Sequence, residues 1–488
     1  MFIRNVFKLG LANIVAQVLS LLVVPLLTRL YSPLDYGAFS IYLAVLNTLI
    51  PIASLRFHAA LAFPTKPEDA RAVFIIALCV LGLGTGFLFL LISFTLYWDV
   101  MPVKWVTSGI YALLWILPFN FAVMGMAQLL NAWRMSQNDF RSTAAARIAE
   151  SFSDRVVSCL CAFSPITHNM GLAWGRLLGS GAAAYTLWRY VHRSYERSMW
   201  ATFSPLHLVC MMNRYRHFAL VSSCAIMCDG AARQVPALLL AFSFSPVIAG
   251  YYALAFQVVN VPLLIAGDAL ASTFFQRAVL SRETPAVLAK DTIRLFRTML
   301  CVIIPLTLVL CFLGKPAFLV LFGPRWEQAG DYAEILAIGF LFIFLHRPLS
   351  VLFDVFEAQT ARLWFDIVNL VLRIAIIIGL AHWFSDPTIV LIGFTIVSAG
   401  LYGIGLLYLL RMVGVTIHQS LSLFSRQVIL FVPLGLALWL VAPMGVDSQP
   451  NFALALIALA LQAFFIFRYE RETISLVSSL TALAHRTP

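Results

Sequence analysis

Charged residues are scarce in this sequence. Only 11% of its 488 residues are Asp, Glu, Lys or Arg, whereas 61% are hydrophobic, and a soluble domain carries about 25% charged residues. A chain of this composition cannot cover its own surface in water, so we predict a polytopic membrane protein. The formal net charge is +11. Because the basic residues fall in short loops, with no basic tail or aromatic-basic module, they do not indicate a nucleic-acid partner.

Patterns that mark metal sites and enzymes are also missing. The eight cysteines include no CxxC pair and no zinc spacing, and Cys301 and Cys311 lie in apolar runs, which is typical of inert buried thiols. The sequence has no phosphate-binding loop of the Walker type, no catalytic Ser-His-Asp constellation and no long outside loop. We therefore expect a transporter rather than an enzyme, with no cofactor or metal.

What the sequence has in abundance is apolar runs of membrane-spanning length. A spanning helix needs about 20 residues, and about fourteen segments qualify. Arg4 and Lys8 precede the first run, but no small-residue cleavage site follows, so we expect an uncleaved first span. The fifth and seventh segments are unusually polar and have to be shielded from lipid. The approximate cores are 9–28, 36–55, 73–97, 106–130, 143–163, 171–190, 218–241, 247–272, 298–322, 332–352, 363–384, 387–410, 427–442 and 451–467.

Lysine and arginine are distributed unevenly over the loops between these segments. If the N-terminus is cytoplasmic, the inside loops collect about 25 of them, and the outside loops hold only Arg29, Lys104, Lys315 and Arg325. This imbalance follows the positive-inside rule, so it predicts cytoplasmic termini and an even number of spans.

A short pattern occurs twice. Pro25 is followed by Gly37 in Asp-Tyr-Gly-Ala-Phe, and Pro236 is followed by Gly250 in Ala-Gly-Tyr-Tyr. In both copies an apolar helix, a short turn and a glycine-aromatic helix start follow one another. Six spans separate the copies, so both run in the same direction, which indicates a parallel repeat of the kind found in some transporters.

The repeat predicts an all-α membrane protein with two six-helix bundles and two extra C-terminal spans. Arginines interleave with aromatic residues in the connection between the bundles, which suits an amphipathic segment on the lipid surface; a plain solvated linker is an equal alternative. The expected boundaries are 1–190 for the N-terminal bundle, 191–217 for the cytoplasmic linker, 218–410 for the C-terminal bundle, and 411–488 for the two extra spans and a cytoplasmic tail.

Four blocks of the sequence point to a family. They are Pro25–Tyr42, Leu55–Pro64, Ala249–Phe256, and Leu321–Leu336 with its Phe-Gly-x-x-Trp-x-x-Ala-Gly pattern. Together they resemble the polysaccharide, or O-antigen repeat-unit, flippases of the multidrug/oligosaccharidyl-lipid/polysaccharide exporter superfamily. The second block departs from the family pattern, because His58 stands where an acidic residue is common.

The resemblance implies a bacterial inner-membrane transporter with a central cavity that opens alternately to either side. It would move undecaprenyl-pyrophosphate-linked oligosaccharide from the cytoplasmic to the periplasmic leaflet for O-antigen, capsule or exopolysaccharide assembly. The energy source would be an H⁺ or Na⁺ gradient, without ATP. The implied partners are the lipid-linked oligosaccharide, membrane lipids, a polysaccharide polymerase and a chain-length regulator.

Two other functions stay open. One is a drug or metabolite exporter of the same superfamily, and the other is the polymerase that joins the repeat units. A slight excess of deep arginines over carboxylates favours an anionic load over a cationic drug. The absence of a long outside loop argues against the polymerase.

A diphosphate cannot enter lipid unpaired, so its path requires fixed positive charge. Ionisable residues within spans are costly and mark such paths by default. For Arg29 and Arg56, at opposite ends of the first two spans, snorkelling to the interface is an equal alternative. The candidates for contact with the pyrophosphate or glycan are Arg29, Arg56, Arg155, Arg176, Arg233, Arg373 and Asn369.

Carboxylates within the spans are candidates for binding the coupling ion. They are Asp154, Asp229, Asp268 and Asp366. Asp154 belongs to a polar stripe that runs from Arg147 through Glu150 to Ser158. Asp229 and Arg233 share a helix face, so a local ion pair is the alternative there. For Asp268 the alternative is an interface charge, and for the stripe of Asp366, Asn369 and Arg373 it is a buried structural ion pair.

Overall fold

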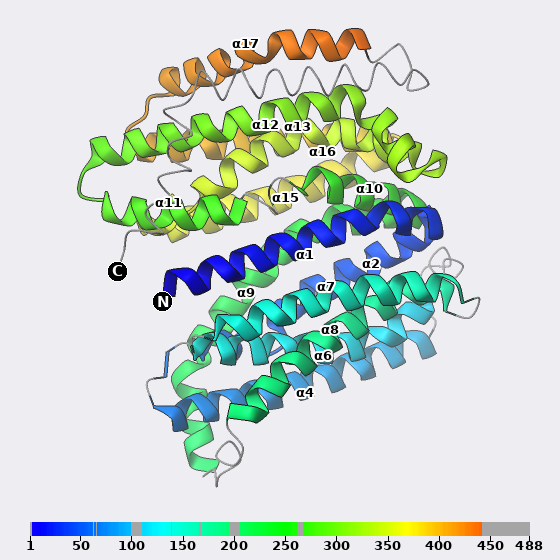
Figure 1. Cartoon of the computed structure of the whole chain (residues 1–488), viewed down its shortest axis with the longest axis vertical. Coiled ribbons are helices and arrows are strands. Elements are labelled where there is room, and N and C mark those ends of the chain that lie inside the picture. Colours follow the sequence, from blue (N-terminus) through cyan, green and yellow to red (C-terminus); the bar gives the residue numbers. More distant parts are fainter. Residues whose placement is uncertain are drawn as a thin grey trace. The chain divides into compact units, whose positions relative to one another are not determined.

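The structure is a computed structural model that describes residues 2–61, 63–64, 66–98, 110–137, 139–164, 167–194, 205–261, 263 and 267–441. Within these residues all regular secondary structure is helical (Figure 1). Eight of the described helices are long and apolar enough to cross a membrane. The chain is therefore an all-α, multi-pass membrane protein, as its composition predicts.

The predicted spans coincide with helices. The first thirteen segments all overlap helices, and the fourteenth, 451–467, lies outside the described residues, so the total of fourteen stays a prediction. Helices α7 and α9 contain the two segments predicted to be unusually polar, and neither is among the eight apolar spans found in the described residues. Residues 205–217 of the expected linker are helical and continuous with the seventh span in α9.

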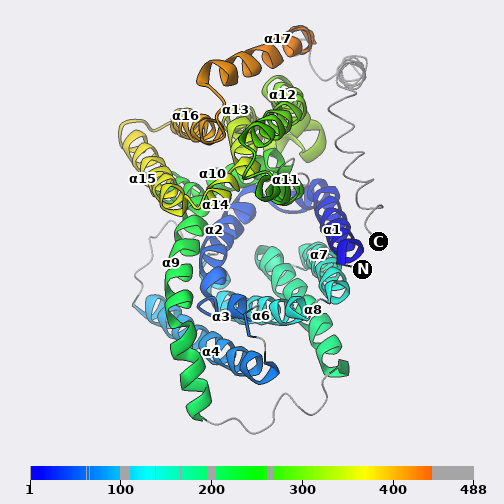
Figure 2. The same ribbon diagram turned by 90° about the vertical axis from the view of Figure 1, so that its left-hand side faces the viewer.

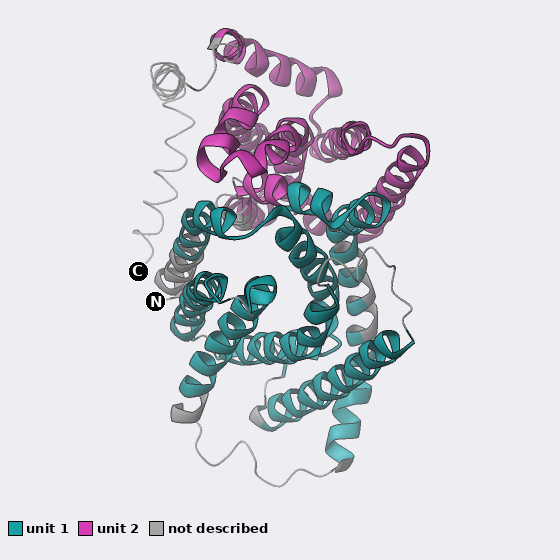
Figure 3. Ribbon diagram, turned by 90° about the vertical axis from the view of Figure 1, so that its right-hand side faces the viewer, with its two compact units in different colours: residues 1–253 teal, residues 254–488 magenta. Residues whose placement is uncertain are grey.

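The chain divides into two compact units, residues 1–253 and 254–488 (Figure 3). The predicted boundaries at 190 and 217 stay a prediction. Unit 1 contains α1 (Phe2–Leu30), α2 (Pro33–Leu49), η1 (Ile50–Ile52), α3 (Phe57–Ala60), α4 (Pro67–Tyr97), α6 (Ile110–Ser136), α7 (Phe140–Ala162), η2 (His168–Met170), α8 (Gly171–Ser194), α9 (Pro205–Ser243) and the start of α10 (Pro246–Val259). Unit 2 contains α11 (Asp268–Leu280), α12 (Pro285–Phe322), η4 (Pro324–Trp326), α13 (Glu327–Leu349), α14 (Leu352–Val355), α15 (Gln359–Trp383), α16 (Pro387–Met412) and α17 (Ile417–Val441).

A capping box makes the tight turn between α1 and α2. The Ser32 hydroxyl accepts a hydrogen bond from the Asp35 backbone N–H at 3.3 Å, and the Asp35 carboxylate accepts one from the Ser32 N–H at 2.9 Å. Pro33 occupies the first helical turn, where its missing N–H costs nothing. The Ser-Pro-Leu-Asp sequence thereby satisfies the exposed backbone donors at the start of α2.

The two glycines of the repeated pattern pack against each other within unit 1. A Cβ atom placed on Gly37 of α2 would lie 1.7 Å from the Pro246 carbonyl oxygen, and one on Gly250 of α10 would lie 2.2 Å from the Pro33 carbonyl oxygen. Only residues without side chains allow the two helix starts to approach this closely. The glycine in each copy is therefore required by backbone contact.

Side chains from several helices fill the interior of unit 1. α9 packs against α2 and α4 (Figure 2). Near one end of α4, Phe74 meets Trp133 of α6 edge to face, with ring centroids 5.2 Å apart. A second cluster joins α2, α4 and α6 through residues such as Leu46, Leu88 and Leu117.

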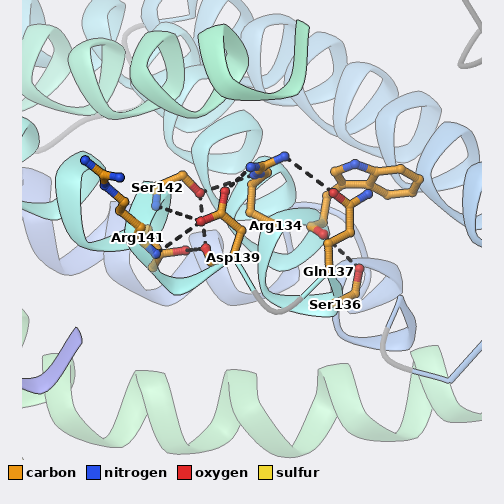
Figure 4. A network of polar contacts seen from close by, with 8 residues as sticks. Arg134, Ser136, Gln137, Asp139, Arg141 and Ser142 are labelled. Atoms are coloured by element: carbon orange, nitrogen blue, oxygen red, sulfur yellow. Dashed lines mark hydrogen bonds and ion pairs between the residues drawn. The ribbon is translucent and has the colours of Figure 1, made fainter. Parts of the chain in front are cut away.

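A buried arginine fixes the corner between α6 and α7 (Figure 4). Arg134 is 5% exposed and donates hydrogen bonds to the Ser142 hydroxyl at 3.2 Å and to the Asp139 carboxylate. Asp139 also accepts hydrogen bonds from the backbone N–H groups of Arg141 and Ser142, which caps α7. One carboxylate thus closes the turn and starts the polar helix α7.

Candidate functional site

Polar residues of α7 and α8 meet in the interior of unit 1. One terminal nitrogen of Arg176 lies 3.2 Å from the Glu150 carboxylate and 4.0 Å from that of Asp154. Asp154 is 8% exposed and also accepts a hydrogen bond from the Ser158 hydroxyl at 3.4 Å. Arg147 approaches Glu150 only to 4.0 Å and is largely exposed. The predicted stripe on α7 is thus neutralised mainly by an arginine of the next helix.

Two glycines bring α8 close enough for this pairing. A Cβ atom on Gly175 would lie 2.0 Å from the Ser158 hydroxyl, and one on Gly179 would lie 2.8 Å from the Asp154 Cβ. Gly-x-x-x-Gly spacing places both on one helix face, which is the usual solution for close helix contact in lipid. Arg176 stands between them and is therefore held at the polar stripe.

A small polar cavity of about 190 Å³ lies beside this ion pair. Arg147, Arg176 and Glu150 supply its charges. The Gln128 Oε1 and the Arg176 Nε are buried without a hydrogen-bond partner among the described residues, and buried polar atoms of this kind require water or a ligand. The lining residues are Ile50, Met124, Ala127, Gln128, Asn131, Thr143, Ala146, Arg147, Glu150, Arg176, Ser180, Ala183 and Leu187.

Unit 2 holds a buried arginine in a different environment. Arg373 of α15 is 6% exposed, and its guanidinium carbon lies 5.3 Å from the ring centroid of Phe394 and 5.0 Å from that of Tyr402. It forms no ion pair with any described carboxylate, and its Nε and one terminal nitrogen have no hydrogen-bond partner within the described part of the chain. Two aromatic faces therefore compensate only part of its charge.

Further polar atoms without partners accompany Arg373 in the packing of α13, α15 and α16. His346 stacks on Phe365 at 4.7 Å and meets Tyr402 at 5.2 Å, which connects it to the rings beside the arginine. Four buried polar atoms here have no hydrogen-bond partner among the described residues: Asn369 Oδ1, His346 Nε2, Thr395 Oγ1 and Ser398 Oγ. Such a concentration of unsatisfied groups marks a place that water or a polar ligand completes.

The other predicted residues lie apart from these two clusters. Arg29 is exposed in the last turn of α1, and Arg56 is half-buried at the start of α3 with a left-handed φ of 61°. Arg155 is half-buried, and its Nε has no partner among the described residues. Arg233 is exposed on α9, and Asp366 is half-buried on α15. The side chains of Asp229 and Asp268 lie outside the described residues.

The structure therefore brings together Asp154 with Arg176, and Asn369 with Arg373. The direct partner of Arg176 is Glu150, which the sequence placed on the polar stripe but not among the candidate site residues. The sequence did not single out Thr395, Ser398 or Tyr402, although their spacing on α16 puts Ser398 and Tyr402 on one helix face. Within the described residues no group of three His, Cys, Asp or Glu side chains is placed to bind a metal ion.

Comparison with known proteins assigns the family. A family described as "Polysaccharide biosynthesis protein" matches residues 26–331, which is more than half of the chain. The chain belongs to this family. Of the four blocks that carry the resemblance, the match covers the second and third completely and the first except for Pro25. It also covers the fourth block as far as residue 331. No curated protein sequence matches the chain.

Solved structures share the fold of this polysaccharide biosynthesis protein. "Lipid II flippase MurJ" in an inward closed conformation superposes with a TM-score of 0.76 at 14% identity, covering 96% of this chain and 99% of that one. An inward-facing MATE family multidrug transporter gives 0.66 at 13% identity, with 82% and 94% covered. A MOP superfamily transporter from Pyrococcus furiosus gives 0.56 at 14% identity, with 85% and 96% covered. These relatives in fold are transporters rather than enzymes, in agreement with the expectation from the sequence.

Proposed function

We propose that the protein flips undecaprenyl-pyrophosphate-linked oligosaccharide from the cytoplasmic to the periplasmic leaflet of the bacterial inner membrane. Its product would serve O-antigen, capsule or exopolysaccharide assembly. Family membership supports a role in polysaccharide biosynthesis, and the fold is that of transporters, one of which is a lipid II flippase.

The observation that carries the proposal is the polar cavity of unit 1. Its side-chain amides and hydroxyls, from Gln128, Asn131, Thr143 and Ser180, are groups that hydrogen-bond sugars. Two arginines and one carboxylate line the cavity, and Asp154 lies 4.0 Å from Arg176, so a diphosphate would compete with these carboxylates for the two guanidinium groups. The one carboxylate in the wall, Glu150, already lies 3.2 Å from Arg176, so a cationic drug would find no unpaired negative charge in this wall.

In this mechanism the cavity residues replace water around the headgroup. The unpartnered Gln128 Oε1 accepts a hydrogen bond from a sugar hydroxyl, and the guanidinium of Arg176 donates its free N–H to a phosphate oxygen. Unit 2 offers phosphate a contact of its own in Arg373, whose charge has no carboxylate partner among the described residues. Alternating access comes from movement of one bundle against the other, coupled to H⁺ or Na⁺ through carboxylates such as Asp154 or Asp366.

A multidrug transporter is the rival function, because a MATE family protein has the same fold. The two functions differ in the transported substrate, since a drug exporter favours cationic, amphipathic molecules. Export of such molecules by the purified chain, without movement of lipid-linked glycan, would replace the flippase proposal.

The test is a flipping assay with the full chain in proteoliposomes. They contain undecaprenyl-pyrophosphate-linked oligosaccharide with a fluorescent label on its glycan, and a membrane-impermeant quencher reports how much label remains outside. We expect the protein to move the label across the bilayer. Gln128→Ala and Asn131→Ala should each slow flipping about tenfold, the cost of one or two lost hydrogen bonds to a sugar.

The matched control is Asn213→Ala. Asn213 is an exposed amide on α9 that does not line the polar cavity, so flipping should be unchanged. Absence of flipping by the wild-type protein at any ion gradient would contradict the proposed function. Equal rates for Asn131→Ala and Asn213→Ala would remove the polar cavity from the glycan path.

A further inference from the structure

A second, larger cavity in unit 1 is almost entirely apolar. It measures about 670 Å³, within the range of about 300–1,000 Å³ for small-molecule sites. α2, α4 and α6 form its walls through residues such as Val45, Phe87 and Leu117. It extends along α4 from Val80 to Thr95, a rise of about 22 Å at 1.5 Å per residue.

The few polar side chains in its wall are already satisfied. The Tyr42 hydroxyl accepts a hydrogen bond from Asn120 Nδ2 at 2.7 Å, and the Thr95 hydroxyl donates to the Ile92 carbonyl at 2.9 Å. Both hydroxyls are thus already engaged in a hydrogen bond, and every other lining residue is apolar, so the wall offers a ligand little hydrogen-bonding capacity. Its occupant has to be a hydrocarbon, since a polar group there would lose its partners.

One side of the cavity is open along a stripe of α4. Leu83, Phe87 and Leu91, each four residues apart, are 76%, 68% and 46% exposed although all three line the cavity. On a membrane-spanning helix such exposure faces lipid or a bound apolar chain. A long hydrocarbon can thus enter sideways, and the small residues Ala53 and Gly84 leave space at the end of the cavity that Phe121 lines.

Residues close together in the sequence line the apolar cavity and the polar one. Leu49, Ile52 and Ala53 line the apolar cavity, while Ile50, between them in sequence, lines the polar cavity. On α6 the same relation holds for Phe121 and Met124. A molecule with a sugar-diphosphate head and a long hydrocarbon tail matches this pair of neighbouring surfaces.

We propose that the α2–α4–α6 cavity binds the polyprenyl chain of the lipid-linked substrate. The proposal rests on the proposed function and extends it to the tail. The apolar cavity keeps the tail beside unit 1 while one part of the headgroup, a single sugar or the diphosphate, contacts the polar cavity. A polyprenyl chain has a methyl branch on every fourth carbon, and the experiment compares it with the unbranched acyl chain of a bulk phospholipid.

The experiment uses two photoreactive lipids with the full chain in proteoliposomes. One is a polyprenyl diphosphate with a diazirine within its chain, and the other is a phosphatidylglycerol with a diazirine in its acyl chain, at equal mole fraction. Mass spectrometry of peptides locates the cross-links. We expect the polyprenyl probe to label residues 80–95 and 110–121 at least about fivefold more than the acyl probe, equivalent to about 1 kcal/mol of preference.

Two glycines of α4 supply matched variants. A Cβ on Gly84 would lie 3.6 and 3.8 Å from two ring atoms of Phe121 and 3.9 Å from the Ala53 carbonyl oxygen, which are ordinary contacts, and a larger side chain would extend into the cavity. Gly86 has nothing within 4 Å and does not line the cavity. Gly84→Phe should lower labelling by the polyprenyl probe about fivefold, and Gly86→Phe should leave it unchanged.

Equal labelling by both probes would assign the cavity to bulk lipid and overturn the proposal, as would equal labelling of the two glycine variants. The labelling pattern of the wild-type protein tests the proposal even if Gly84→Phe fails to fold.

Flipping measured in the same vesicles separates the two proposals. A wild-type protein that flips glycan without labelling the groove contradicts the tail site alone, and one that labels the groove without flipping contradicts the proposed function alone.

Discussion

Arg176 in unit 1 and Arg373 in unit 2 are both arginines within membrane-spanning helices, yet their surroundings are opposite. Arg176 lies 3.2 Å from Glu150 and 4.0 Å from Asp154. Arg373 is more deeply buried, lies against two aromatic rings and has no described carboxylate partner. One charge is neutralised by the fold, and the other is left for something else to neutralise.

Because their surroundings differ, removing each arginine should affect a different property, either the stability of the fold or transport. A buried ion pair becomes costly when one partner is removed, because the remaining charge stays in a medium of low dielectric. A buried charge without a counterion is already costly in the folded protein. We therefore expect removal of Arg176 to weaken the fold first, and removal of Arg373 to weaken transport first.

The largest effect is expected for Arg373→Ala. Flipping should fall roughly 100-fold, because a buried charged contact to phosphate is worth about 3 kcal/mol. The free energy of unfolding should stay the same or rise by about 1 kcal/mol, since an unpaired buried charge is lost. Flipping in proteoliposomes and thermal unfolding in detergent measure the two quantities. A variant that flips normally but unfolds more easily would make Arg373 a structural residue.

The second effect is expected for Arg176→Ala, which leaves Glu150 and Asp154 without their cation. The free energy of unfolding should fall by about 3 kcal/mol, as in other broken buried pairs. Arg147→Ala is the control, because Arg147 approaches the same Glu150 only to 4.0 Å and is 54% exposed, so its loss should cost at most about 0.5 kcal/mol. Chemical denaturation of the two variants side by side tests this. Equal losses of unfolding free energy in the two variants would mean that the partly buried Arg176–Glu150 pair stabilises the fold no more than the exposed Arg147–Glu150 pair does.

The smallest effect concerns the rings beside Arg373. Tyr402→Leu should remove about 1 kcal/mol of cation–π stabilisation. In the Arg373→Ala background that part of the loss should vanish, although lost packing against Phe365 and His346 will remain in both. A double-mutant cycle of unfolding free energies isolates the coupling. A coupling energy of zero would show that the rings pack beside the guanidinium without holding its charge.

The sequence predicted the helices well because long apolar runs between basic loops leave few alternatives. The structure confirms the all-α membrane fold, and helix α2 starts at Pro33, directly after the short turn predicted before Gly37. The division into two compact units is harder to predict from the sequence, because it depends on which helices pack together. Gly37 and Gly250 were recognised as a repeat, but no local pattern revealed that they touch.

For the candidate sites, helical spacing predicted the members of each stripe but not their partners. Asp154 and Ser158 are one turn apart, so the sequence indicates their shared face. The contact between Arg176 and Glu150 crosses from one helix to the next, and depends on the approach that Gly175 and Gly179 allow. Likewise, nothing in the sequence near Arg373 shows that aromatic residues of α16, rather than a carboxylate, lie beside it.

The close contact of α8 with α7 has a consequence for how the protein enters the membrane. α7 carries Arg147, Glu150, Asp154 and Arg155, and neither α7 nor α8 is among the helices apolar enough to span alone. A nascent α7 that met lipid by itself would have to desolvate all of these charges. The two helices have to leave the insertion machinery together, as a hairpin whose ion pairs are already formed. The Gly175-x-x-x-Gly179 face is then a requirement of biogenesis, and its failure would appear as loss of protein from the membrane before any loss of transport.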